Sequence, residues 1–185
     1  MILHVWSRTR PEDQVATKAV IGELTHSYNV DSILAREPDD YWKALCLWWN
    51  ADDDIINIEQ DNVPTVAQID ELAACPYPLC TYPYWRKEQI VLWDYLPGMD
   101  DDPTGRRSWV SLEEPVPDFV KGSGFGCVKI GKSVRKLVNI TKYPVKQYEW
   151  WSIDTWFSTQ LLATGIEWHV HKDFVKHNRR WDWEG

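Results

Sequence analysis

The chain has 185 residues, a length typical of one domain, and a domain of this size buries about two thirds of its unfolded surface. Hydrophobic residues make up 44% of the sequence and charged residues 26%, which excludes a largely disordered chain. The formal net charge is −8 and the basic residues are scattered apart from Arg106-Arg107 and Arg179-Arg180, which argues against binding duplex DNA through a basic stripe.

The first half of the chain alternates between predicted strands and helices. Apolar and aromatic patterns predict strands at 2–6, 30–34, 55–58 and 79–84, and helices at 12–24, at 40–50 and after Pro64. The prolines of segment 79–84 predict that this strand lies at an edge of its sheet. The alternation favours an α/β domain, a three-layer α/β/α sandwich around a mostly parallel central sheet.

The second half of the chain is less regular. Residues 94–118 are rich in turn-forming and charged side chains, which indicates a mobile loop. Segments 90–93 and 108–112 are expected to pair as a hairpin across this loop. The glycine-rich segment Gly122–Ile130 leads into a strand but lacks the Gly-Lys-Ser/Thr ending of a phosphate-binding loop. The remaining predicted elements are a short helix at 132–138, a helix at 153–164 closed by Gly165, and strands at 166–170 and 174–176.

Two carboxylates, Glu59 and Asp61, follow the apolar strand 55–58. Residues two apart on a strand point the same way, and buried carboxylates are costly without a positive partner. Ligands collect beyond the carboxyl ends of parallel strands, so Ser7–Arg10 and Glu59–Asp61 are expected at one rim. Mg²⁺ and Mn²⁺ prefer such oxygen ligands. The alternative is that these acids only precede the helix near Pro64, where the helix dipole favours negative charge.

The cysteines and histidines give a weaker pattern. Cys75 and Cys80 are spaced more widely than a usual zinc-binding pair, which favours buried free thiols over a metal site or a disulfide. His169 and His171 point to one side of a predicted strand, as a zinc site could begin, but ordinary strand histidines are favoured. With no apolar run near the ~20 residues that span a bilayer and no signal peptide pattern, we expect a cytoplasmic protein.

Four pieces of the chain, in order, resemble the GT-A fold glycosyltransferases of the family-2-like group, the nucleotide-diphospho-sugar transferases. The turn Ser7-Arg8-Thr9-Arg10-Pro11 is similar to the family's first turn, and Glu59-Gln60-Asp61 is similar to its Asp-x-Asp motif. Segment 122–133 resembles a glycine-containing strand and basic turn, and Asp154 through Gly165 resembles the acidic helix start, Leu-rich helix and closing glycine. Val175-Lys176-His177 then resembles a strand ending in Val-x-His, so the resemblance covers most of the chain outside about 85–118.

The resemblance implies a single GT-A-like domain over 1–185, with a nucleotide-sugar-binding half at 1–84, an acceptor half at 119–185 and a mobile loop at 94–118. It implies a metal-dependent, hexosyltransferase-like enzyme that uses Mn²⁺ or Mg²⁺ and a nucleotide-diphosphate sugar, with a UDP-sugar favoured and inversion expected. The roles that it implies are a metal contact for Asp61, a metal or ribose contact for Glu59, a metal or diphosphate contact for His177, nucleotide contacts for Arg8 and Arg10, a base or ribose contact for Asp31 at the end of the second strand, and the general base for Asp154.

Other interpretations remain open. The family has two acids where this chain has Ile153 and Asp154, so a non-catalytic module that binds a carbohydrate or a protein is the main alternative. Asp154 alone is also explained as a first-turn acid favoured by the helix dipole. A nucleotidyl transferase would need a glycine-rich phosphate loop, and 7–11 contains no glycine. The acceptor stays unidentified, and a nucleic acid acceptor is disfavoured by the net charge.

Overall fold

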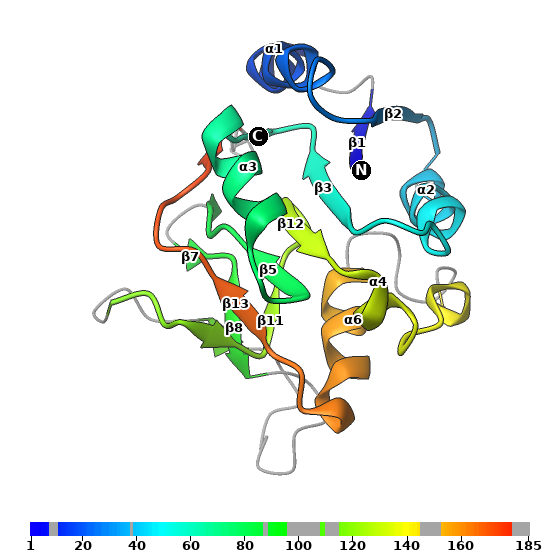
Figure 1. Cartoon of the computed structure of the whole chain (residues 1–185), viewed down its shortest axis with the longest axis vertical. Helices are drawn as coiled ribbons and strands as arrows, with labels where there is room; N and C mark the ends of the chain where they lie inside the picture. Colours follow the sequence, from blue (N-terminus) through cyan, green and yellow to red (C-terminus); the bar gives the residue numbers. More distant parts are fainter. Residues whose placement is uncertain are drawn as a thin grey trace, which may run out of the picture.

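The computed structural model describes residues 1–7, 11–37, 39–86, 89–95, 108–109, 115–144 and 153–178. Its centre is a seven-stranded sheet with the order β10-β13-β5-β12-β3-β1-β2 (Figure 1). The bounds of these strands are Phe119–Val120 for β10, Trp168–Val170 for β13, Leu79–Thr81 for β5, Cys127–Ile130 for β12, Ile55–Glu59 for β3, Ile2–Ser7 for β1 and Val30–Ala35 for β2.

The central sheet is mostly parallel. β1 pairs in parallel with β2 and β3, and β13 pairs in parallel with β5. β12 runs antiparallel to both β3 and β5, and β10 runs antiparallel to β13, so only β12 and β10 oppose the common direction. The mostly parallel α/β sheet expected from the sequence is therefore confirmed.

Helices cover both faces of this sheet (Figure 1). Alternation along β1 sends Ile2 to one face and Leu3 to the other, as expected for a strand buried on both sides. The Ile2 face packs against α1 and α3, and the Leu3 face packs against α2, α4 and α6. The bounds of these helices are Val15–Leu24 for α1, Val66–Ala74 for α3, Asp40–Trp48 for α2, Lys132–Arg135 for α4 and Ile153–Leu161 for α6.

Shorter elements surround the main sheet. A three-stranded sheet has the order β11-β8-β9, β14 pairs with β4, and β6 pairs with β7. Their bounds are Gly122–Ser123 for β11, Leu92–Tyr95 for β8, Ser108–Trp109 for β9, Lys176–His177 for β14, Asn62–Val63 for β4, Trp85–Arg86 for β6 and Gln89–Ile90 for β7, and the 3₁₀ helices are Pro11–Gln14, Ile140–Lys142 and Leu162–Thr164. Among the helices of the described segments, none has the length and apolarity that crossing a membrane requires.

Two predictions about the middle of the chain have different outcomes. The prediction that segment 79–84 forms an edge strand is wrong, because β5 lies inside the sheet between β13 and β12. Pro78 and Pro83 lie outside the strand and therefore remove no hydrogen bond from it. The predicted hairpin across the loop is confirmed in part, since Trp93 pairs with Trp109. Most of 94–118 lies outside the described residues.

Local capping explains two of the helix ends. Thr65 forms a capping box with Gln68 at the start of α3, in which each side chain bonds the other residue's backbone N–H. The buried guanidinium of Arg135 serves the end of α2 from α4: it donates to the carbonyl oxygens of Trp48 at 2.9 Å and Trp49 at 2.8 Å. It also donates to the carbonyls of Ala51 and Asp53 in the following turn, which fixes the entry to β3.

Candidate active site

Two of the side chains predicted to bind a metal, Asp61 and His177, meet just after the end of β3. Glu59 is the last residue of β3, and Asp61 follows in the turn before β4. Antiparallel pairing of β4 with β14 sets His177 opposite Asn62 and therefore beside Asp61. The Asn178 N–H also donates to the Asp61 carbonyl at 2.7 Å. His177 Nε2 consequently lies 3.5 Å from Asp61 Oδ2, with both side chains almost fully buried.

Tyr84 is a buried tyrosine whose pKa is affected by acids from both halves of the chain. Its ring stacks on that of His177, with centroids 5.2 Å apart and an interplanar angle of 18°. Burial raises the pKa of Tyr84 well above its usual range, and the negative charges of Glu59, Asp154 and Asp61 raise it further. These three carboxylates therefore act on one buried phenol, and the Arg86 guanidinium opposes their effect.

Tyr41 is a second buried phenol at the same site. Burial raises its pKa well above its usual range, followed by the charge and hydrogen bond of Glu59 and the charge of Asp154. Asn57 of β3 donates to the Tyr41 hydroxyl at 3.1 Å and is itself fully buried. The site thus extends from α2, through β3, to the start of α6.

Asp154 lies in the first turn of α6 and is half buried. Its Oδ1 accepts a hydrogen bond of 2.6 Å from the Thr155 N–H, so the carboxylate turns toward the start of the helix. The positive end of the helix dipole favours the ionised carboxylate at this position. An ionised carboxylate with partial access to solvent is able to accept a proton.

The glycine-rich segment before β12 makes room for Tyr84. A Cβ on Gly124 would lie 2.3 Å from the Tyr84 hydroxyl oxygen. A Cβ on Gly126 would lie 2.6 Å from Tyr84 Cε1 and 2.6 Å from Asn62 Nδ2. Side chains at either position would therefore displace the ring that stacks on His177, so these glycines are needed for the packing of Tyr84.

Two donors of the kind that a divalent cation uses, Asp61 and His177, lie together here. Asp61 offers carboxylate oxygens and His177 an imidazole nitrogen at the separation given above, and Glu59 ends the adjoining strand. Carboxylate oxygens with one imidazole suit Mn²⁺, and Mg²⁺ accepts the oxygen donors. Among the described residues, Glu59 joins no group of three donors within 4.8 Å of one another, so the pair that could hold a cation is Asp61 and His177.

Asp31 does not belong to this group. The prediction that it ends the second strand is wrong, because β2 runs from Val30 to Ala35 and Asp31 is its second residue. Asp31 pairs in register with Leu3, whereas Glu59 pairs with Val5 farther along β1. The Asp31 carboxylate accepts a 2.7 Å hydrogen bond from Trp48 Nε1, which anchors α2.

Arg8 and Arg10 lie outside the described residues. Sequence reasoning missed Tyr84 and Tyr41, since neither stands in a motif. The signal for Tyr84 was indirect, in the alternate glycines 124 and 126 that leave space for its ring.

Comparison with known proteins identifies a shared fold. No protein-family model and no curated protein sequence matches the chain. A solved structure that is similar is that of A197 from STIV, with a TM-score of 0.58 and 14% sequence identity. The match covers 92% of this chain and 81% of A197. The two chains therefore share a fold, and at this identity the likeness carries no further conclusion.

Proposed function

We propose that the chain is a metal-dependent glycosyltransferase that binds a nucleotide-diphosphate sugar, with a UDP-sugar favoured, and transfers the sugar with inversion. The proposal is supported by the position of Asp61 beside His177, which stacks on Tyr84, and by the charges of Glu59, Asp154 and Asp61, which all raise the pKa of Tyr84. These residues come from the two halves of the chain, and the likeness of their order to a GT-A fold glycosyltransferase is independent of their geometry.

The charges at the site favour a cation together with an anionic ligand. Among the described residues, three carboxylates act on Tyr84 and the guanidinium of Arg86 opposes them. A nucleoside diphosphate would be repelled by this arrangement unless a divalent cation lay between them. Asp61 and His177 would hold that cation, and Glu59 would lie beside the cation or the ribose. A cation there would stabilise the charge that develops on the departing diphosphate.

Asp154 has the properties of the general base in this proposal. It would accept the proton of the acceptor hydroxyl while that oxygen forms a bond to the anomeric carbon and the bond to the diphosphate breaks. One displacement of this kind inverts the configuration at the anomeric carbon. Tyr84 and Tyr41, with pKa values raised by burial, stay protonated at neutral pH, and the Tyr41 hydroxyl hydrogen-bonds Glu59.

A second function is a non-catalytic module that binds a carbohydrate or a protein. The position before Asp154 holds Ile153, which is fully buried in the core against the Leu3 face of the sheet. That position therefore serves packing and supplies no second acid. A folded protein with no metal-dependent affinity for any nucleoside diphosphate would favour this alternative.

The two functions are separated by thermal stability measured with UDP, GDP, CDP and dTDP, each with and without Mn²⁺. A ligand at about 100 times its dissociation constant adds about 2.7 kcal/mol to the free energy of unfolding, which shifts the melting temperature visibly. We expect a shift that needs both the metal and one nucleotide, and release of labelled sugar from the matching donor. Absence of any shift with every nucleotide would contradict the proposal.

A further inference from the structure

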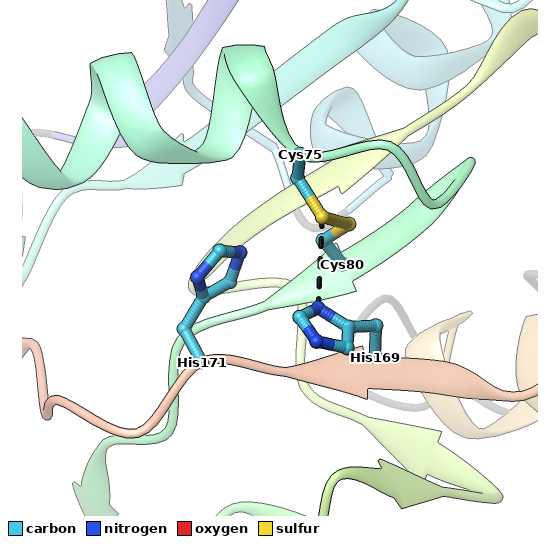
Figure 2. A group of neighbouring side chains, drawn as sticks. All are labelled: Cys75, Cys80, His169 and His171. Atoms are coloured by element: carbon cyan, nitrogen blue, oxygen red, sulfur yellow. Dashed lines mark hydrogen bonds between the residues drawn. A yellow bond between two sulfur atoms is a disulfide. The ribbon is translucent and has the colours of Figure 1, made fainter.

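We propose that Cys75, Cys80, His169 and His171 bind one zinc ion in a closed Cys₂His₂ site (Figure 2). One ligand atom from each of these four side chains lies within 4.8 Å of the ligand atoms of the other three. The inference is independent of the proposed glycosyl transfer, because it rests on a different set of side chains.

Three elements bring the four ligands together. Cys75 caps the C-terminus of α3, and Cys80 lies in the middle of β5. Parallel pairing of β13 with β5 sets His169 in register with Cys80. His171 directly follows β13, and its backbone N–H donates to the Thr81 carbonyl at 3.0 Å. The pairing of the two strands therefore places the histidines over the cysteines.

The separations suit a metal better than a direct sulfur–sulfur bond. The structure joins the two cysteines in a disulfide, yet their Cα atoms are 7.2 Å apart, beyond the roughly 4.4–6.8 Å usual for disulfides. His169 Nδ1 lies 3.5 Å from Cys75 Sγ. Tetrahedral zinc, with bonds of about 2.3 Å to sulfur and about 2.0 Å to nitrogen, holds such atoms about 3.5 Å apart. In the reduced protein, zinc would replace the two thiol protons.

Glu71 orients His171 as a carboxylate orients a zinc-bound histidine. His171 Nδ1 lies 2.8 Å from Glu71 Oε1, and the Tyr82 hydroxyl donates to the other oxygen of the same carboxylate. The opposite ring nitrogen, Nε2, is buried and has no hydrogen-bond partner within the described segments. A histidine that donates Nδ1–H to a carboxylate and keeps Nε2 free is typical of zinc ligation.

Stacking fixes both imidazole rings. His169 stacks on Tyr77 with centroids 4.4 Å apart, and His171 stacks on Tyr82 with centroids 4.5 Å apart. Cys80 is fully buried, and Cys75 and His171 are almost so. Sulfur and imidazole donors favour zinc over Mg²⁺ or Mn²⁺, and four protein ligands leave no position for a substrate. The site therefore has the composition of a structural zinc centre.

The test uses the full chain, expressed in zinc-containing medium and purified with a reductant and without chelator. Elemental analysis should find one zinc ion per chain. Replacement of zinc by Co²⁺ should give the visible absorption of tetrahedral cobalt and the near-ultraviolet band of a cobalt–thiolate bond. Cys80→Ser and His171→Gln should remove both the zinc and the spectrum, whereas Cys46→Ser, which changes a free cysteine outside the cluster, should keep them.

Glu71→Gln separates ligation from folding, since the Glu71 side chain is more than half exposed. It should weaken zinc affinity by about 10–100-fold and leave the secondary structure unchanged. If Cys80→Ser fails to fold, the cobalt spectrum of the unsubstituted chain and the metal content of His171→Gln still show whether the cluster binds zinc. Reduced protein without zinc and without a cobalt–thiolate band would overturn the proposal, as would zinc binding that survives both ligand substitutions.

Discussion

The ring of Tyr84 lies directly against the backbone of Gly126, so that a Cβ at position 126 would approach Tyr84 Cε1 to 2.6 Å. Gly126→Ala should therefore displace the ring or strain β12, because overpacking a buried site costs about 1–3 kcal/mol. We expect the free energy of unfolding to fall by that amount in urea denaturation.

Gly22→Ala is the matched control for that substitution. Gly22 lies inside α1, and a Cβ there meets nothing within 4 Å. Alanine is favoured over glycine in a helix interior by about 1 kcal/mol, so this variant should be more stable than the parent. Equal effects of the two substitutions would contradict the packing of Tyr84 against Gly126.

Arg135→Met should destabilise the chain by about 2–4 kcal/mol, because it removes the donors to four backbone carbonyls at the end of α2 and in the turn that follows it. Methionine keeps most of the buried length of the side chain, so the decrease in the free energy of unfolding measures the contribution of the hydrogen bonds. Lys136→Met, at the exposed neighbouring position, should change the free energy of unfolding by less than about 0.5 kcal/mol.

Acidification below neutral pH should destabilise the chain through His4. Burial lowers the pKa of His4, the Ile58 carbonyl partly offsets this, and the charge of Lys18 lowers it again. As the pH falls through about 6.5, His4 therefore binds a proton in the unfolded chain before it does so in the folded chain. The stability is fully present above that pH and is lost as the pH falls, by at most about 1.4 kcal/mol per pH unit.

His4→Gln isolates this contribution from those of the other histidines. Glutamine keeps a hydrogen-bond donor but does not titrate. The slope of the free energy of unfolding against pH, between pH 7 and 5, should therefore fall by up to about 1.4 kcal/mol per pH unit, the value for one proton. Urea denaturation at several pH values provides the measurement, and identical slopes for the two chains would contradict the assignment to His4.

Substitutions in the candidate active site should separate donor binding from transfer. Asp61→Asn should abolish the metal-dependent thermal shift with nucleotide, because it removes the charged ligand beside His177. Asp154→Asn should keep that shift and lose sugar transfer by at least about 100-fold, the range usual for loss of a general base. Glu23→Gln, on the exposed side of α1, should leave both unchanged. Transfer that persists in Asp154→Asn would show that another group accepts the proton.

Chelation of zinc under reducing conditions should lower the melting temperature. A structural ion present at 100 times its dissociation constant adds about 2.7 kcal/mol, which corresponds to about 5–10 °C for a domain of this size. Calorimetry with and without chelator gives the difference, and Cys80→Ser should show none.

Local patterns predicted the fold more fully than the site. The strand over 55–58 and the helix after Pro64 are both determined by residues that are neighbours in sequence, and both formed as expected. Asp61 and His177 were expected to share a role only because the order of motifs resembled a family, and their meeting depends on the pairing of β4 with β14. Spacing along the chain could not reveal the cysteine–histidine cluster, since its halves meet only through the register of β5 and β13.

The segment after α3 and the C-terminal segment run side by side for longer than β5 and β13 themselves. Tyr82 faces His171, Tyr84 faces His177, and Tyr84 bridges in parallel to Val175. A slip of one residue between two such segments turns every side chain of one to its opposite face. The register that sets Cys80 beside His169 and the stack of Tyr84 on His177 thus depend on a single alignment of these two segments. A bond or ion that fixes the alignment at Cys80 and His169 therefore also fixes it at Tyr84 and His177.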